Sequence, residues 1–245
     1  MKRLLSVTIA CAAFAGFAFA GPYFVPGDYY DCGAGTWCFD ANNEMFDDGL
    51  HGDGGVGDGI FGVYVPSNQA AGRHEFKFAY SDWSNAYHPN CNLWVYIENM
   101  NDVIHFTYDV NVYADGWVPT NNIVWSDKLY PAGTMFEVIG DAPETGGWAF
   151  GVPGALSGTM FEVTITIGTA GGYGYKWRAV GDWEVQNFGG EGAVPCGFNA
   201  GYETTFDNQD VLFQFDTATG RIRATPLEPT STEEASWGSV KKLFE

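Results

Sequence analysis

The 245-residue chain has few basic residues: 11 Lys and Arg stand against 30 Asp and Glu, which gives a formal net charge of −19. Proteins that bind nucleic acids or anionic membranes neutralise phosphates with basic patches. The composition therefore argues against both kinds of partner. It leaves uncharged ligands, cationic ligands and metal ions.

Motifs of catalysis are also missing. The four histidines (His51, His74, His88 and His105) form no HExxH and no visible triad. In the segment Gly154–Gly158, Ser157 lies one position later than the serine of a G-x-S-x-G nucleophile elbow. Acidic residues are plentiful, but no motif singles out the carboxylate pair that glycoside cleavage requires. We expect a protein that is not an enzyme, and keep a hydrolase as the remote alternative.

Long apolar runs are confined to the start of the chain. Lys2 and Arg3 precede an apolar run that ends in Ala18-Phe19-Ala20. This order is typical of a secretory signal peptide, so we predict cleavage after Ala20 and a secreted or cell-surface protein. A retained membrane helix is the alternative, but the run is short and no charged stop-transfer flank follows. Cys11 raises a second alternative, a lipoprotein signal, but Thr8 is a poor residue three places before such a cysteine.

Cysteine is scarce, with four left after such cleavage: Cys32, Cys38, Cys91 and Cys196. Secretion permits disulfides, and four cysteines allow three pairings. Cys32 with Cys38 closes a short loop and is the pairing we expect first. Cys91 and Cys196 occupy similar loops of the repeat described next, and their pairing would require those loops to face each other. No second Cys/His pair has zinc-ligand spacing, so zinc is not expected.

The chain does contain an internal repeat, residues 74–109 and again 174–216. Each copy has an aromatic-Lys-aromatic triplet, an Asp-Trp pair, an Asn, and twelve residues later a strand that ends in Asp. The matching positions are Lys77 and Lys176, Trp83 and Trp183, Asn92 and Asn199, and the strands Ile104–Asp109 and Val211–Asp216. A period of about 110 residues indicates tandem domains, since solenoid units are shorter.

Short alternating apolar segments joined by Gly, Pro and Asn turns predict an all-β protein of two tandem immunoglobulin-like β-sandwich modules. Phe161–Ile167 is the clearest strand, with its odd-numbered residues facing a core. Further strands are predicted in the first module at Ile60–Val65, Phe76–Ala79, Leu93–Ile97 and Ile104–Tyr108. We assign Trp37 and Trp148 to the two cores. The predicted units are the signal peptide (1–20), a first module (21–112), a connecting segment (113–131), a second module (132–225), and a linker with an amphipathic tail (226–245).

Two of these units need comment. The connecting segment contains Trp117, Ile123 and Trp125 and is too apolar for a free linker, so we expect it to pack on one module or between both. The tail presents Trp237 and Phe244 on one face of a short helix. It is interpreted either as a disordered end or as a docking or sorting tail that uses those two residues.

The repeated pattern resembles the glycogen-binding and starch-binding β-sandwich modules that accompany pullulanases, branching enzymes and the β-subunit of the AMP-activated kinase. The pullulanase-associated version is the most similar, because its last strand also runs into Asp. The resemblance covers both modules and implies α-glucan binding by a Lys, a Trp and an Asn. The residues at these places are Lys77, Trp83 and Asn92 in the first module, and Lys176, Trp183 and Asn199 in the second.

Those residue types suit a sugar. Pyranose rings have apolar C–H faces that lie flat on an aromatic ring, while Lys and Asn hydrogen-bond the hydroxyls. The structural alternative is that the Trp residues cover the sandwich, the Lys residues are ordinary strand positions and the Asn residues only make turns. The loop between Trp183 and Asn199 is also seven residues longer than that between Trp83 and Asn92, so the two modules need not bind alike.

An acidic, Gly-rich loop lies between residues 45 and 61. Its carboxylates (Asp47, Asp48, Asp53 and Asp58) interleave with glycines and offer the oxygen ligands that Ca²⁺ prefers. The EF-hand spacing is not matched, because the terminal Glu is missing. The loop is therefore a calcium site or a tight Asp/Gly turn.

The sequence favours a secreted, non-catalytic carbohydrate-binding protein that recognises polysaccharide or oligosaccharide. A structural or adhesive cell-surface protein with the same fold and no sugar site is the alternative. It rests on the disulfides, the negative charge, the acidic loop and the tail. If Trp83 and Trp183 are buried, the assignment of the sugar site fails, because a buried Trp cannot stack on a sugar.

Overall fold

The computed structural model describes residues 19–229, so most of the predicted signal peptide and the predicted tail with Trp237 and Phe244 lie outside the described residues. The described chain is all-β. Its one helical element is a single 3-10 turn, η1 (Pro143–Thr145). No helix within residues 19–229 has the length and apolar character that crossing a membrane demands.

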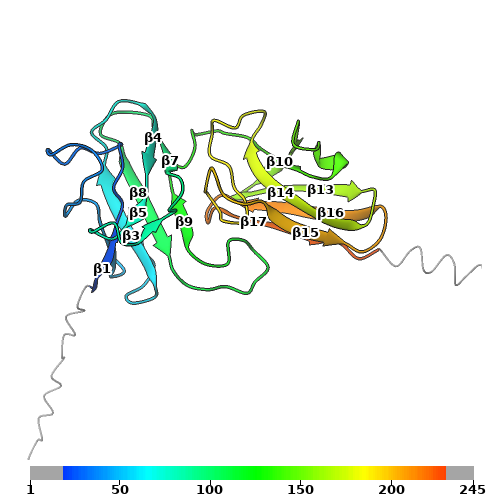
Figure 1. Ribbon diagram of the computed structural model, residues 1–245, viewed down its shortest axis with the longest axis horizontal. Helices are drawn as coiled ribbons and strands as arrows, with labels where there is room; N and C mark the ends of the chain where they lie inside the picture. The colour runs from blue at the N-terminus through cyan, green and yellow to red at the C-terminus, as the bar shows by residue number, and fades with distance from the viewer. Residues whose placement is uncertain (1–18, 230–245) are drawn as a thin grey trace, which may run out of the picture.

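The first half of the molecule contains nine strands: β1 (Phe19–Phe24), β2 (Glu44–Asp47), β3 (Ile60–Pro66), β4 (Gly72–Phe76), β5 (Phe78–Ala79), β6 (Ala86–Tyr87), β7 (Leu93–Ile97), β8 (Val103–Asp109) and β9 (Ile123–Ser126). Seven of them form a curled antiparallel sheet in the order β6-β5-β1-β2-β3-β8-β9, and β4 pairs with β7 (Figure 1). The β4–β7 pair packs on this sheet, with the ring of Phe76 4.9 Å from that of Phe106.

The second half contains eight strands: β10 (Phe136–Gly140), β11 (Val152–Pro153), β12 (Ala155–Ser157), β13 (Met160–Ile167), β14 (Gly171–Ala179), β15 (Ala200–Thr204), β16 (Gln209–Asp216) and β17 (Arg221–Pro226). They form two four-stranded antiparallel sheets, β11-β10-β14-β15 and β12-β13-β16-β17. The sheets pack face to face: Phe136 of one lies 4.9 Å from Phe215 and 5.4 Å from Phe161 of the other.

Strand β13 shows why the sequence forms this layer. Phe161, Ile165 and Ile167 are buried, whereas Thr164 and Thr166 are exposed. Side chains alternate across a strand, so the alternating sequence buries one face against the opposite sheet. The predicted strand and its faces are confirmed, except that Val163 is only half-buried.

The internal repeat is visible in the backbone hydrogen bonds. The amide of Asp28 donates to the carbonyl of Glu75 (2.9 Å), and the amide of Asp141 donates to that of Gly174 at the same distance. Each aspartate also accepts a hydrogen bond in the opposite direction. The backbone N–H of Glu75 donates to the carboxylate of Asp28, and that of Gly174 donates to the carboxylate of Asp141. The two Gly-Asp openings therefore clamp equivalent strands in the two halves.

The assignment of Trp37 and Trp148 to the cores is wrong, because both side chains are half-buried at the surface. Their backbones have φ of 61° and 68°, a turn conformation, and their amides donate to the carbonyls of Gly27 and Gly140. The fully buried tryptophan is Trp177, which lies in a strand. Trp177 thus points into the core from its strand, whereas Trp37 and Trp148 lie in turns at the edge of the core.

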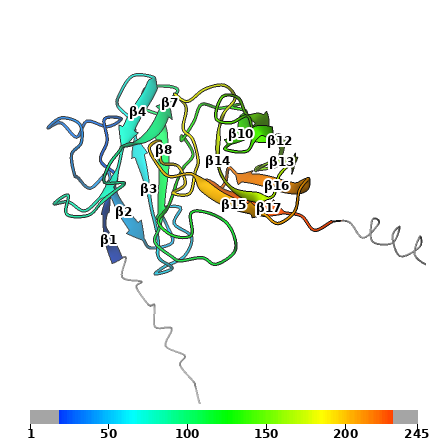
Figure 2. The same cartoon turned by 45° about the vertical axis from the view of Figure 1, so that its right-hand side comes forward.

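The connecting segment contacts both halves. Its β9 is the edge strand of the first sheet, and the indole N–H of Trp125 in that strand donates to the carbonyl of Thr217 in the second half (2.9 Å). Val118 forms a β-bridge with Ile222 of β17. Figures 1 and 2 show the two halves side by side, with the green connection running along the seam between them. The segment therefore fixes one half against the other.

Candidate functional site

Two disulfides are present among the described residues. Cys32 pairs with Cys38, as the sequence predicts, and Cys91 pairs with Cys196. The second bond joins the halves across 105 residues of sequence, with a Cα–Cα distance of 6.2 Å. The equivalent loops of the two copies thus face each other, as this pairing requires.

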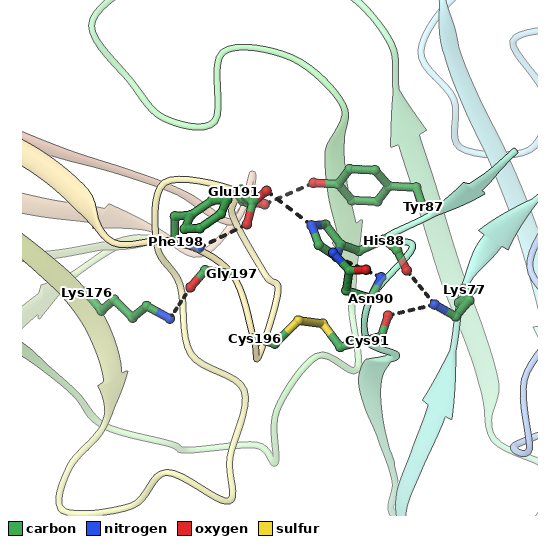
Figure 3. Close-up of polar contacts among 10 residues, drawn as sticks. All are labelled: Lys77, Tyr87, His88, Asn90, Cys91, Lys176, Glu191, Cys196, Gly197 and Phe198. Atoms are coloured by element: carbon green, nitrogen blue, oxygen red, sulfur yellow. Dashed lines mark hydrogen bonds and ion pairs between the residues drawn. A yellow bond between two sulfur atoms is a disulfide. The ribbon is translucent and has the colours of Figure 1, made fainter.

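Each of the repeated lysines holds one of these loops. The ammonium of Lys77 donates to the carbonyls of His88 and Cys91, and that of Lys176 donates to the carbonyl of Gly197 (2.7 Å) (Figure 3). Lys176 also donates to Oδ1 of Asn187 (3.1 Å). Burial lowers the pKa of both lysines below its usual value. An ammonium has three N–H donors. Each lysine is therefore largely committed to its loop. Lys176 is also buried, so only the half-buried Lys77 has a donor left for a ligand.

The two asparagines differ. Asn92 is half-buried and donates its amide to a carboxylate oxygen of Glu75 (2.6 Å). Asn199 is exposed. The longer loop that precedes Asn199 places it differently from its counterpart, which agrees with the expectation that the modules differ.

The first half carries a surface cluster of aromatic rings around Trp83. The Trp83 side chain is 42% exposed. Its ring lies 4.8 Å from that of Phe39, edge to face, and 6.4 Å from that of Trp37. Both neighbours are half-buried. We call Trp37, Phe39 and Trp83 the aromatic platform.

The backbone at this platform is unusual. Trp37 and Trp83 both have φ of 61°. This left-handed region is uncommon for residues other than Gly, Asn and Asp, and a bulky side chain there is strained. Two tryptophans with this backbone conformation thus meet at one surface of the first half.

The second half does not repeat this cluster. Trp183 is 38% exposed, and the guanidinium of Arg178 lies 4.5 Å from its ring centroid, which covers one face. Arg178 is in turn held by Glu137, with an Nε–Oε1 distance of 2.8 Å. Within residues 19–229 no aromatic ring pairs with Trp183 or with Trp148. Trp183 therefore offers only one ring face to a ligand.

The four aspartates of the acidic loop close turns. Asp47, Asp48, Asp53 and Asp58 all accept backbone N–H hydrogen bonds from nearby loop residues, with N···O distances of 2.5–3.1 Å. Such contacts are typical of Asp in tight turns. Oδ1 of the buried Asp53 has no partner in the described part of the chain. The turn role is thus visible, and calcium binding stays a prediction.

One cluster of metal-ligating residue types occurs in the described chain: His88, Cys91 and Cys196 have ligand atoms within 4.8 Å of one another. The two cysteines are joined as a disulfide and offer no thiolate. Nε2 of His88 lies 3.1 Å from Oε1 of Glu191, which comes from the other half. This cluster therefore fastens the two halves and holds no metal in its oxidised form.

No protein-family model matches the chain, and no curated protein matches it. The resemblance of the repeat to glycogen-binding and starch-binding modules therefore rests on its own residues. Sequence reasoning missed Phe39 and Arg178, which contact Trp83 and Trp183. Phe39 follows Trp37 by two residues, and this closeness in the sequence is the signal that links Phe39 to the platform.

Proposed function

We propose that the chain is an extracytoplasmic, non-catalytic carbohydrate-binding protein that recognises α-glucan through the aromatic platform of its first half. The observation that carries the proposal is the exposed Trp83 ring, set at a strained backbone angle beside Phe39 and Trp37. Two disulfides support a location outside the cytoplasm, where such bonds persist.

The platform suits a sugar physically. Burying apolar ring area contributes roughly 25 cal/mol per Å², and aromatic faces take up the C–H side of a pyranose. The Asn92 amide and the remaining donor of Lys77 are the polar groups that the resemblance implies for the hydroxyls. Hydrogen bonds in an open site contribute only about 0.5–1.5 kcal/mol each, so we expect the rings to dominate the affinity.

The proposal includes the finer fold assignment, two immunoglobulin-like β-sandwich modules. The facing sheets of the second half support it, as do the matched Gly-Asp clamps of the two halves. It also includes weaker binding by the second module, whose Trp183 has one face beneath Arg178. Two unequal sites on one chain still gain avidity on a polymer when the geometry lets both engage.

Native gel retardation tests the proposal, with gels that contain amylopectin, glycogen or cellulose. We expect the α-glucans to retard the wild-type protein. Trp83→Ala should remove most of the retardation, and Trp183→Ala a smaller part. Tyr64→Ala is the matched control, because Tyr64 of strand β3 is an exposed aromatic (48%) outside the platform. Equal mobility of all variants in every gel would favour the structural or adhesive alternative.

A further inference from the structure

A second candidate site lies at the seam between the two halves. A cleft of about 300 Å³ opens there, and its lining includes Thr107, Asp109, Tyr113, Trp125, Thr219 and Arg221. This volume is at the lower end of the range for small-molecule sites, which often form between domains. The aromatic platform contributes no residue to it.

The floor of the cleft is the outer face of the first sheet. Thr107 of β8 is the cross-strand partner of Trp125 of β9, so their side chains share a face. Asp109 lies two residues further along β8 on the same face. The alternate residues of β8, Phe106 and Tyr108, are buried in the core on the opposite face. The sheet that builds the core of the first half therefore also presents an organised outer surface.

The wall comes from the connecting segment and the second half. Tyr113 and Thr219 line it, together with Arg221. Arg221 is already neutralised: its guanidinium donates to both carboxylate oxygens of Asp115 (2.7 and 2.8 Å), and its Nε donates to the carbonyl of Pro119 (3.0 Å). The cleft thus has no free cation, and with the strong net negative charge it does not suit an anionic ligand.

The groups that remain suit a neutral polyol with an apolar face. Trp125 is half-buried, and its N–H donates to the carbonyl of Thr217. Its ring packs edge to face with that of His105 (5.5 Å), and the part of the ring that lines the cleft is available for stacking. Oδ2 of Asp109 accepts one hydrogen bond, from Tyr113 (2.8 Å), so further lone pairs are available. The hydroxyl of Thr107 has no hydrogen-bond partner among residues 19–229. An aromatic ring beside a carboxylate and a hydroxyl is the chemistry that holds a single pyranose unit.

We infer that this seam cleft binds one neutral hexose unit, such as the free end of a glucan chain, separately from the aromatic platform. The inference rests on the proposed function, because it takes the same class of ligand. It adds that a site is built by both halves together. Neither half alone has both the floor and the wall.

Nuclear magnetic resonance of the indole N–H groups distinguishes the two sites. Trp125 reports on the cleft and Trp83 on the platform, and Trp125→Phe and Trp83→Phe assign the two signals. Maltotriose is the probe. We expect it to shift the Trp125 signal of the full-length mature protein. Ala218→Trp, at an exposed position that lines the cleft, should weaken this response at least tenfold while the Trp83 response persists. Thr107→Val should weaken it about threefold without filling the cleft.

The outcomes separate the two proposals. A shift of the Trp83 signal with no change at Trp125 would overturn the cleft and leave the platform standing. An unchanged Trp125 response in Ala218→Trp would also overturn it. A response at Trp125 alone would support the cleft and move the sugar site away from the platform. If neither signal responds and no gel retards the protein, the carbohydrate function fails and the cleft inference fails with it.

Discussion

At the scale of single residues, Trp83 combines exposure with a strained backbone. Its φ of 61° lies in the left-handed region, where a Cβ costs about 1–2 kcal/mol. Glycine has no such penalty. We therefore predict that Trp83→Gly is more stable than Trp83→Ala by about 1 kcal/mol, measured by urea unfolding, although both variants lose sugar binding.

The control is Trp94, a half-buried tryptophan of strand β7 with ordinary extended backbone. There the order should reverse, because Gly in a strand is less stable than Ala by roughly 0.5–1 kcal/mol. If Ala is the more stable replacement at both positions, the backbone at Trp83 is not strained, and the observation that carries the proposed function loses its force.

Residue-level inference from the sequence placed Trp83 and Trp183 at the surface, as found, but wrongly assigned Trp37 and Trp148 to the cores and was incomplete for the lysines. Exposure of Trp83 and Trp183 is what sugar stacking requires. The lysines alternate with core aromatics, so the pattern correctly points them away from the core. The carbonyls that Lys77 and Lys176 reach belong to loops 11 to 21 residues further on. No local pattern encodes such a contact.

At the scale of secondary-structure elements, a buried ion pair joins β10 to β14. Glu137 and Arg178 are cross-strand partners with side chains 5% and 4% exposed. Removing one partner of such a pair leaves an uncompensated charge. We predict that Glu137→Leu lowers the free energy of unfolding by about 3–5 kcal/mol. The double variant Glu137→Leu/Arg178→Leu should lose much less, because no charge is left buried.

A double-mutant cycle by urea unfolding tests this, with Arg178→Leu as the fourth corner. Additive losses in the double variant would mean that the two charges do not stabilise each other. Arg73→Leu is a useful comparison. Arg73 pairs with Glu184, whose side chain is 82% exposed, and its loss should cost no more than about 1 kcal/mol.

Strand periodicity predicted the strands with the clearest alternation, and one of its misses has a plain physical cause. β7 begins and ends where its alternating sequence predicts, and β13 gains one residue. The segment Phe76–Ala79, predicted as one strand, is split at Lys77, whose amide donates to the carbonyl of Pro26. Phe76 pairs with β7, whereas Phe78 pairs with β6. A change of partner in mid-strand depends on tertiary structure and leaves no mark in the alternation.

At the scale of the whole molecule, the ion pair of Asp115 with Arg221 holds the connecting segment on the second half. Arg221 lowers the pKa of Asp115 from 3.8 to about 2. Because the folded pKa is below the unfolded one, the pair contributes stability above pH 3.8, and this is lost as the pH falls toward 2. The Asp115 side chain is 46% exposed, so solvent screening keeps the contribution below about 1 kcal/mol.

Asp115→Asn tests this contribution. The difference in unfolding free energy between the wild type and the variant should be largest near pH 5 and should shrink between pH 4 and pH 2. All other carboxylates are shared, so the difference isolates Asp115. A difference that stays constant over this range would mean that the charge of Asp115 does not stabilise the fold.

The tandem organisation follows from the repeat, but the placement of the halves does not. A repeat fixes what each copy contains and says nothing about how the copies face each other. The Cys91–Cys196 bond, the His88–Glu191 contact and the bridge from Val118 to Ile222 all join segments about 100 residues apart. These contacts form the seam, and the cleft inferred there was for that reason invisible in the sequence.

The disulfide of the seam gives the sharpest test of how the halves depend on each other. Cross-links stabilise mainly by restricting the unfolded chain, and the effect grows with the logarithm of the loop length. The Cys91–Cys196 bond closes 105 residues and the Cys32–Cys38 bond closes six. For a loop of about 100 residues the entropic contribution is about 4.7 kcal/mol, roughly 2 kcal/mol more than for the short loop.

We therefore predict a larger loss of unfolding free energy in Cys91→Ser/Cys196→Ser than in Cys32→Ser/Cys38→Ser. Urea unfolding should show one transition in the wild type and two in the seam variant, because each half has its own sheets and no sheet extends across both. Equal losses in the two variants, with one transition in each, would mean that the halves unfold as a unit without the cross-link.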